Sequence, residues 1–266
     1  RMRDQALTRA GATRNGLFLF DPRRHDYGAK TFLGETFPAG HGLDEIDRAI
    51  HLLATNPATA HHIAFKLARR FLSDTPPKSL VDAMAGSYLR SGGKISATLM
   101  PLIASREFAE SLAKPSKFKE PVDYMISAAR AACSGTPIGN RFLLAASAQD
   151  MGAAPFMHTT PDGYGVAESD WLSPAAMAKR TRLAMAIAAG KAPLASGPVD
   201  DAPEPALPRG GDMKPAWARG TACEPDADTV ARLAGPLSAS TLAAETGLSD
   251  RERIALILAS PEFMRR

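Results

Sequence analysis

Apolar residues recur at helical spacing along most of the chain. After Gly42, the segment LDEIDRAIHLLA places Leu43, Ile46, Ile50 and Leu53 on one face of a helix. Such a pattern is typical of a helix that buries one side against other elements of the fold. The same spacing returns in segment after segment, so the sequence predicts a chain made mainly of packed helices.

Proline, glycine and serine mark where the predicted helices begin and end. Pro57 follows the N-cap candidate Asn56, and the pair Ser173–Pro174 provides a cap and a first helical residue. Together these signals predict helices over residues 57–72, 78–91, 94–105, 105–113, 121–134, 139–150 and 174–189, and again within 226–266.

Residues 16–40 differ from this pattern because they are rich in Gly, Phe and Thr. The stretches LFLF and KTFLGETF read as two short strands around the loop DPRRHDYGA. The predicted fold class is therefore mainly α, a multi-helix globular domain with one short β-hairpin near the N-terminus. We expect a helical core over residues 1–190 that includes this hairpin at 16–40.

Residues 191–225 carry seven prolines and little apolar periodicity, which predicts a long loop or linker. Residues 226–266 return to the helical pattern, and we expect these C-terminal helices to pack on the core. The chain starts with RMRDQALTRAG, which has no apolar segment typical of a signal peptide. It reads as a helix already in progress, so we expect the chain to be a fragment.

Composition narrows the classes of function. The chain has 266 residues with 45% apolar and only 6% aromatic content, and alanine is common, which favours helices packed through small residues. The net charge is +4, from 32 basic and 28 acidic residues without a long basic block, which disfavours nucleic-acid binding. No stretch approaches about 20 apolar residues, so we expect no membrane span.

The two cysteines, Cys133 and Cys223, lack the CxxC spacing of thiolate metal sites. They form one disulfide only in an oxidising compartment and are otherwise two independent thiols. The sequence leaves both alternatives open. It contains no P-loop, dinucleotide-binding or nucleophile-elbow motif, and we predict no metal site.

The first polar cluster with candidate chemistry is Arg24, His25, Asp26 and Lys30 in the hairpin loop. A His beside an Asp can serve as a general base, and a nearby Lys can bind an anion. Adjacent residues of an extended segment point to opposite sides, so His25 and Asp26 are not expected to form a dyad with each other. The alternative is a structural role, in which Asp26 caps a turn and Lys30 is solvated.

A second cluster is His62 and Lys66, which are four residues apart on one face of a predicted helix near Arg69 and Arg70. A basic face of this kind can bind an acidic glycan or phosphate. The alternative is a solvated polar face. His61 and His62 are neighbours on the helix and lack the spacing of a zinc motif.

The third candidate is the loop 155–171, which combines aromatic and acidic side chains. Such loops occur in carbohydrate-binding clefts, and two suitably spaced carboxylates can hydrolyse a glycoside. The alternative is a loop folded onto helices, anchored by its tryptophan. The candidate catalytic residues are His25, Asp26 and Glu168, and the loop contributes the candidate binding residues His158, Asp162, Tyr164 and Trp171.

Several blocks of sequence resemble the bacterial DUF1800 family. They read HDYGAKTFLG, LLATNPATAHHIAFKLARRFLSDTPP, SGGKISATLMPLIASREF, KFKEPVDYMISAAR and LASPEFMRR, in the family's order and spacing. Where the family tends to have a Gly-Trp pair in its later loop, this chain reads DGYG, so Tyr164 stands in for the tryptophan. The proline-rich stretch has no counterpart that we can match.

The resemblance implies a large, mostly helical bacterial protein without an assigned reaction or cofactor. It identifies this chain with the family's C-terminal portion, so that a helical N-terminal half of its own chain is expected to be missing. Members are often encoded beside sulfatase-like DUF1501 proteins that are exported, which implies a periplasmic or secreted location. We therefore consider an envelope accessory protein with a DUF1501 partner, a polysaccharide hydrolase, or a purely structural helical module.

Overall fold

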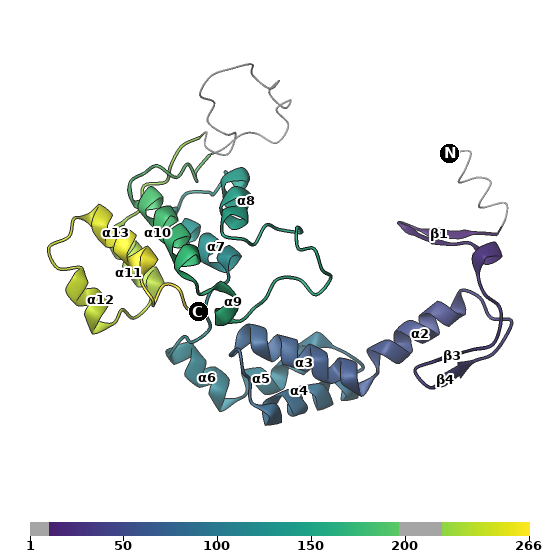
Figure 1. Ribbon diagram of the computed structural model, residues 1–266. Coiled ribbons are helices and arrows are strands. Elements are labelled where there is room, and N and C mark those ends of the chain that lie inside the picture. Colours follow the sequence, from purple (N-terminus) through teal and green to yellow (C-terminus); the bar gives the residue numbers. More distant parts are fainter. Residues whose placement is uncertain (1–10, 197–219) are drawn as a thin grey trace, which may run out of the picture. The chain divides into compact units, whose positions relative to one another are not determined.

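The computed structural model describes residues 11–196 and 220–266, and Figure 1 shows its elements. These residues form twelve α-helices, one short 3-10 helix and four short strands. The mainly helical class with a small antiparallel sheet near the N-terminus is thereby confirmed. The chain divides into two compact units, which are described separately.

Unit 1 comprises the described residues up to 68 together with 77–105. Its helices α4 and α5 pack against each other, and α3 buries the stripe Ala60, Ala64 and Ala68 at intervals of four residues. The elements are β1 (Thr13–Asn15), β2 (Phe18–Phe20), η1 (Pro22–Arg24), β3 (Lys30–Phe32), β4 (Glu35–Phe37), α2 (Asp44–Ala54), α3 (Pro57–Phe71, whose end lies in unit 2), α4 (Lys78–Arg90) and α5 (Ile95–Ile103).

The region predicted as one hairpin over 16–40 contains strands of two hairpins. The LFLF strand pairs backwards with residues 13–15, so that Thr13 lies opposite Phe20. The segment KTFLGETF folds on itself and places Lys30 opposite Phe37. Its turn uses Leu33 and Gly34, both with positive φ (51° and 84°), which matches the twist of a two-residue hairpin turn. The predicted pairing of LFLF with KTFLGETF is therefore wrong.

The apolar face of α2 is largely uncovered within the described residues. Glu45 is the buried residue of this helix, whereas Ile50 and Leu53 keep 58% and 45% of their surface exposed. The neighbouring β1–β2 hairpin also exposes Leu17 and Phe18. We call α2 and this hairpin the arm. The spacing of the apolar residues predicts that this face is buried against another surface, but the described residues leave it largely exposed.

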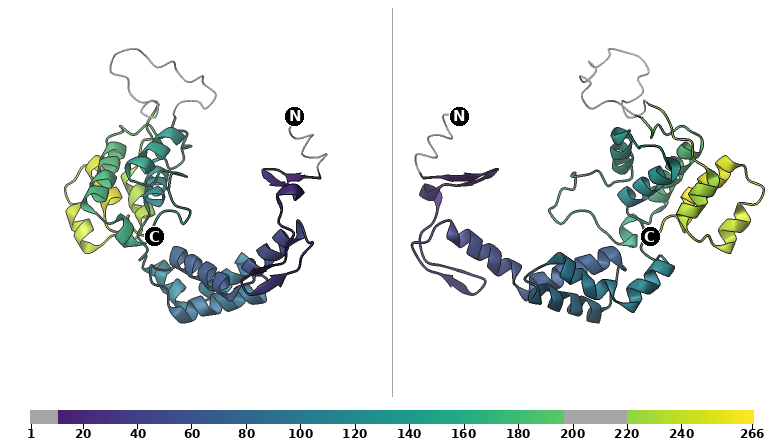
Figure 2. Two further views of the ribbon diagram at one scale, coloured as in Figure 1. Left: turned by 45° about the vertical axis from the view of Figure 1, so that its right-hand side comes forward. Right: turned by 180° about the vertical axis from the view of Figure 1, so that it is seen from behind.

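Unit 2 comprises residues 69–76 and the described residues from 106 onwards. Helices α10 and α13 pack side by side, α11 lies on α13, and α7 contacts α8, α10 and α11 (Figures 1 and 2). The helices are α6 (Arg106–Ala113), α7 (Pro121–Ala132), α8 (Arg141–Asp150), α9 (Glu168–Trp171), α10 (Pro174–Ala188), α11 (Ala227–Ala234), α12 (Ala239–Ala244) and α13 (Asp250–Ala259).

Residues 117–119 pair with residues 264–266 in the core of unit 2. The backbone N–H of Lys119 donates to the Met264 carbonyl at 2.7 Å, and that of Arg266 donates to the Lys117 carbonyl at 2.9 Å. This strand-like pairing buries Phe263, whose ring meets the Tyr124 ring edge-on at 5.9 Å between centroids. The C-terminal residues are thus part of the core.

A buried arginine lies at the centre of this core. Arg180 on α10 is only 1% exposed, donates to the Lys119 carbonyl at 2.7 Å, and stacks 4.6 Å from the Phe118 ring centroid. Burial lowers the pKa of Arg180 to about 10 and the pKa of Lys119 to about 8. The core therefore buries two cations that are satisfied by carbonyl groups and aromatic rings.

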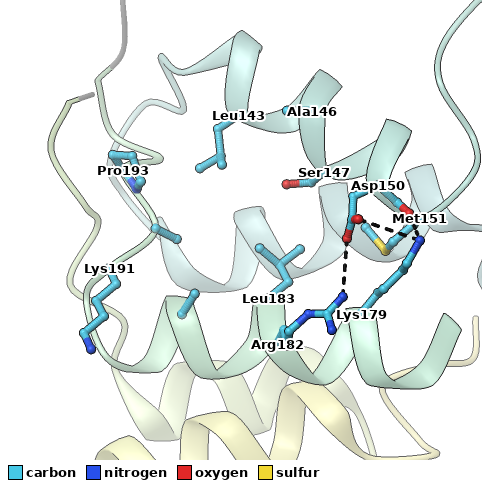
Figure 3. Close-up of a pocket in the computed structure, with 12 residues that line it drawn as sticks. Leu143, Ala146, Ser147, Asp150, Met151, Lys179, Arg182, Leu183, Lys191 and Pro193 are labelled. Atoms are coloured by element: carbon cyan, nitrogen blue, oxygen red, sulfur yellow. Dashed lines mark hydrogen bonds and ion pairs between the residues drawn. The ribbon is translucent and has the colours of Figure 1, made fainter. Parts of the chain in front are cut away.

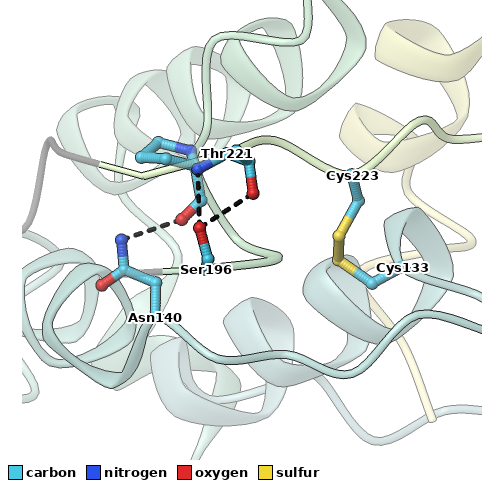
Figure 4. The surroundings of a disulfide bond; sticks show 6 residues. Cys133, Asn140, Ser196, Thr221 and Cys223 are labelled. Atoms are coloured by element: carbon cyan, nitrogen blue, oxygen red, sulfur yellow. Dashed lines mark hydrogen bonds between the residues drawn. A yellow bond between two sulfur atoms is a disulfide. The ribbon is translucent and has the colours of Figure 1, made fainter. Parts of the chain in front are cut away.

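A disulfide between Cys133 and Cys223 joins the end of α7 to the segment before α11 (Figure 4). Both cysteines are buried, and their Cα atoms are 5.1 Å apart. The structure thus decides between the two alternatives that the sequence left open. Nearby, Thr221 N–H donates to Ser196 Oγ at 3.0 Å. Most of the predicted loop 191–225, namely residues 197–219, lies outside the described residues.

Candidate functional site

The hairpin loop and α2 form a charged cluster in unit 1. Lys30 Nζ donates to Glu45 Oε2 and to the Asp26 carbonyl, each at 2.6 Å. His25 Nε2 lies 3.3 Å from the same Glu45 oxygen, close enough for an ion pair when the imidazole is protonated. The cluster therefore contains His25 and Lys30, as the sequence suggested, but its centre is Glu45.

Glu45 is the functional candidate that the sequence analysis missed. It is 7% exposed, and its Oε1 atom is buried without a hydrogen-bond partner in the part of the chain that the structure describes, as is His25 Nε2. A buried polar atom without a partner is uncommon and marks a position worth testing. The sequence could have indicated Glu45 by its position in the first turn of α2, which follows the β3–β4 hairpin. Glu45, His25 and Lys30 also line a hollow of about 340 Å³ whose walls are mostly apolar.

The remaining loop candidates have local roles. The Asp26 carboxylate accepts the Gly28 N–H at 2.8 Å, so it stabilises a turn, and no dyad with His25 is formed. The His25 ring instead contacts the rings of Phe20 and Tyr27. Arg24 is exposed at the end of η1.

His62 and Lys66 lie on the exposed surface of α3, as their spacing predicted. Neither side chain forms a hydrogen bond or ion pair with another described residue. The adjacent Arg70 does not join them, because its guanidinium pairs with Glu120 and with Asp123 at 3.0 Å. Arg70 is therefore paired elsewhere, whereas His62 and Lys66 are exposed on α3.

Three aromatic side chains of the loop 155–171 contact one another in a row. The rings of His158 and Tyr164 lie 4.6 Å apart, and those of Tyr164 and Trp171 lie 6.1 Å apart. Tyr164 Oη donates to the Ala154 carbonyl and Trp171 Nε1 to the Gly165 carbonyl, each at 2.8 Å. Three of the four predicted binding residues of the loop are thus in contact.

The carboxylates of this loop are separately engaged. Asp162 accepts a hydrogen bond from Thr160, which also contacts His158. Glu168 pairs with Arg265 at 2.6 Å, and its backbone N–H donates to Asp74 Oδ2 at 2.7 Å. Each of these two carboxylates therefore has its own partner in the structure.

Asp74 and Lys117 form a further ion pair beside Glu168 that the sequence analysis missed. Lys117 is 3% exposed and also donates to the Val166 carbonyl. Burial acts to raise the pKa of Asp74, but hydrogen bonds from Lys117 and from the Glu168 backbone outweigh it and lower that pKa. These contacts attach the loop to unit 2, which favours a structural role for Glu168.

A hollow of about 590 Å³ lies between α8 and α10 in unit 2 (Figure 3). Leu143 and Leu183 point into it from the two helices. At one end, Lys179 and Arg182 lie 3.7 and 3.9 Å from the Asp150 carboxylate. Sequence reasoning missed this site, because its lining comes from alanine-rich segments that read as ordinary core.

Comparisons with known proteins place the chain by family only. The family model described as "Protein of unknown function (DUF1800)" matches residues 4–265. No curated protein and no solved structure matches the chain. The match covers nearly the whole chain rather than a C-terminal portion alone, so the expectation of a missing N-terminal half of the chain is not supported.

Among the described residues, no group of three or more His, Cys, Asp or Glu side chains is close enough to bind a metal ion. None of the helices in the described ranges is long and apolar enough to cross a membrane.

Proposed function

The chain belongs to the DUF1800 family of proteins of unknown function, and from this premise we propose that it is an exported accessory protein of the bacterial envelope. It acts by docking its arm on a partner protein. The observation that carries the proposal is the apolar face of α2, where Ile50 and Leu53 are 58% and 45% exposed. Contiguous exposed apolar surface typically marks an interaction site.

The arm has the composition of a docking surface. Helix α2 presents residues spaced for burial, and the adjoining hairpin adds Leu17, Phe18 and Leu19, which are exposed as well. An amphipathic helix that lays its apolar face into a groove is a common mode of recognition. The partner we propose is a sulfatase-like DUF1501 protein, and this choice rests on the resemblance described for the sequence.

The proposed periplasmic or secreted location is supported by the buried disulfide between Cys133 and Cys223. Disulfides persist in oxidising compartments and are rare in the bacterial cytosol. The location can be tested by fractionating cells after their free thiols have been blocked. We expect the protein in the periplasm or medium with neither cysteine labelled. A reduced cytosolic protein would contradict the proposal.

The docking proposal can be tested by co-purification of the full chain with a DUF1501 protein encoded beside it. The double variant Ile50→Ser/Leu53→Ser should lose at least about tenfold in affinity, since two apolar anchors leave the interface. The matched control is Leu112→Ser on α6, which removes an apolar side chain that is 70% exposed outside the arm. Equal binding by both variants, or no association of the wild type, would contradict it.

A hydrolase acting on polysaccharide has weaker support. Asp26 caps a turn and Glu168 is paired with Arg265, so neither carboxylate is held ready for proton transfer. A screen of glycan substrates separates the two functions, with Asp26→Ala and Glu168→Ala as controls. Turnover by the wild type that either variant abolishes would favour the hydrolase.

A further inference from the structure

We propose that the hollow between α8 and α10 binds a single-chain aliphatic carboxylate. This inference is independent of the proposed function, because the hollow lies in unit 2 and the arm lies in unit 1. At about 590 Å³ it has the size of a small-molecule pocket. The argument rests on its walls and on the charges at one end.

The walls suit a flexible alkyl chain. Leu143 and Leu183 face each other across the space in Figure 3, and the rest of the apolar lining is aliphatic, with Met151 as its one sulfur-containing member. Among the described residues, the lining includes no aromatic ring on which a planar ligand could stack. A methionine and several alanines adapt readily to a chain of variable conformation.

The charges at one end suit a single carboxylate. Lys179 and Arg182 surround the one acidic group there, Asp150, which leaves a surplus of one positive charge. The Arg182 guanidinium is 3.9 Å from that carboxylate and 62% exposed, so most of its N–H donors have no acceptor among the described residues. A ligand carboxylate can accept hydrogen bonds from Arg182 and Lys179 while its chain enters the hollow.

The opposite ligand charge fits less well. The Asp150 carboxylate already lies between two cations, so an alkylammonium group would have to approach both of them. Lys191 provides a matched control. It belongs to the rim of the hollow, but its side chain points away from the space between the helices in Figure 3.

The test is calorimetric titration of the full chain with hexanoate, octanoate, decanoate and dodecanoate, below their micellar concentrations. Affinity should rise by about fourfold for each added methylene until the hollow is full, and then level off. Alcohols and alkylamines of equal length should bind at least about tenfold more weakly, because they lack the anionic group.

Variants separate the contribution of the apolar walls to binding from that of the charged side chains. Arg182→Ala should weaken decanoate binding by about tenfold, whereas Lys191→Ala should change it by less than about twofold. Ala146→Phe should abolish binding by filling the hollow, while leaving the charges in place. Circular dichroism and thermal melting of each variant show whether it is folded.

Three outcomes would overturn the proposal. They are affinity independent of chain length, amines that bind as well as carboxylates, and equal losses in the Arg182 and Lys191 variants. Should Ala146→Phe fail to fold, Arg182→Ala and the chain-length series still decide the question, because neither alters the packing of the core.

Discussion

Helices α2 and α10 differ both in the pattern of their apolar residues and in their surroundings: those of α2 gather on one face, whereas those of α10 are spread around the helix. Helix α10 buries Arg180, Ala184, Ile187 and Ala188 against the core of unit 2, whereas α2 buries Glu45 and leaves its apolar stripe mostly exposed. The difference shows that periodicity identifies the face to be covered but does not identify what covers it. For α10 the cover is α7 and α13; for α2 we propose a partner protein.

The largest expected effect concerns the disulfide that closes the core beside α7. The variant Cys133→Ser/Cys223→Ser should lose about 4 kcal/mol of unfolding free energy, because the bond closes a loop with a sequence separation of 90 residues. Urea unfolding measures the loss. A reducing agent should lower the stability of the wild type but not of this variant, and a loss below about 1 kcal/mol would contradict the expectation.

The next effect concerns the buried arginine of α10. Arg180→Ala should cost about 3 kcal/mol, since it opens a cavity and leaves the Lys119 carbonyl without its donor. Arg182→Ala, two residues along the same helix, should change stability by less than about 0.5 kcal/mol because its side chain is 62% exposed. Similar losses in both variants would mean that the two sides of α10 do not differ as described.

The third prediction uses pH to probe the same core. Burial lowers the pKa of Lys119 from 10.5 to about 8, so above pH 8 the unfolded chain binds more protons at this residue than the folded chain. The contribution of Lys119 to stability therefore rises between about pH 8 and 10, by at most about 1.4 kcal/mol per pH unit.

The contribution of Lys119 levels off above its ordinary pKa of 10.5, where the unfolded chain also loses this proton. Two other buried groups act there in opposite directions: burial raises the pKa of the Tyr124 hydroxyl, which lowers stability with rising pH, and burial lowers the pKa of Arg180 to about 10, which raises it. Denaturant unfolding across the window measures the slope. In Lys119→Met the titrating group is absent, so its slope should be smaller than that of the wild type; an unchanged slope would assign the effect elsewhere.

The smallest expected effect sharpens the contrast for α2. Ile50→Ser/Leu53→Ser should change the stability of the isolated chain by less than about 1 kcal/mol, because both side chains are already largely exposed. Thermal unfolding without a partner provides the measurement. A loss of several kcal/mol would show that the chain covers this face itself.

The sequence predicts the elements whose signals are local. Ser173 and Pro174 start α10 as expected, and the Ser173 side chain accepts the Ala176 N–H at 3.2 Å. The strand pairing was mispredicted because strands of three residues carry little register information, and the two-residue turn at Leu33 was read as part of a strand.

The candidate sites were predicted only where neighbours in the chain are also neighbours in space. His158, Tyr164 and Trp171 lie within one loop and do come together. Glu45, Asp74 and Lys117 were missed because their partners are 15 to 43 residues away along the chain. The hollow between α8 and α10 could not be predicted, because it depends on how the two helices lie relative to each other, and periodicity does not give that information.

The pairing of residues 117–119 with the last residues of the chain has a consequence for synthesis. Lys119 donates to the carbonyl of Phe263, 144 residues later, so the ribosome makes one half of this contact roughly 7–30 s before the other. During that interval the α7 segment cannot complete its core.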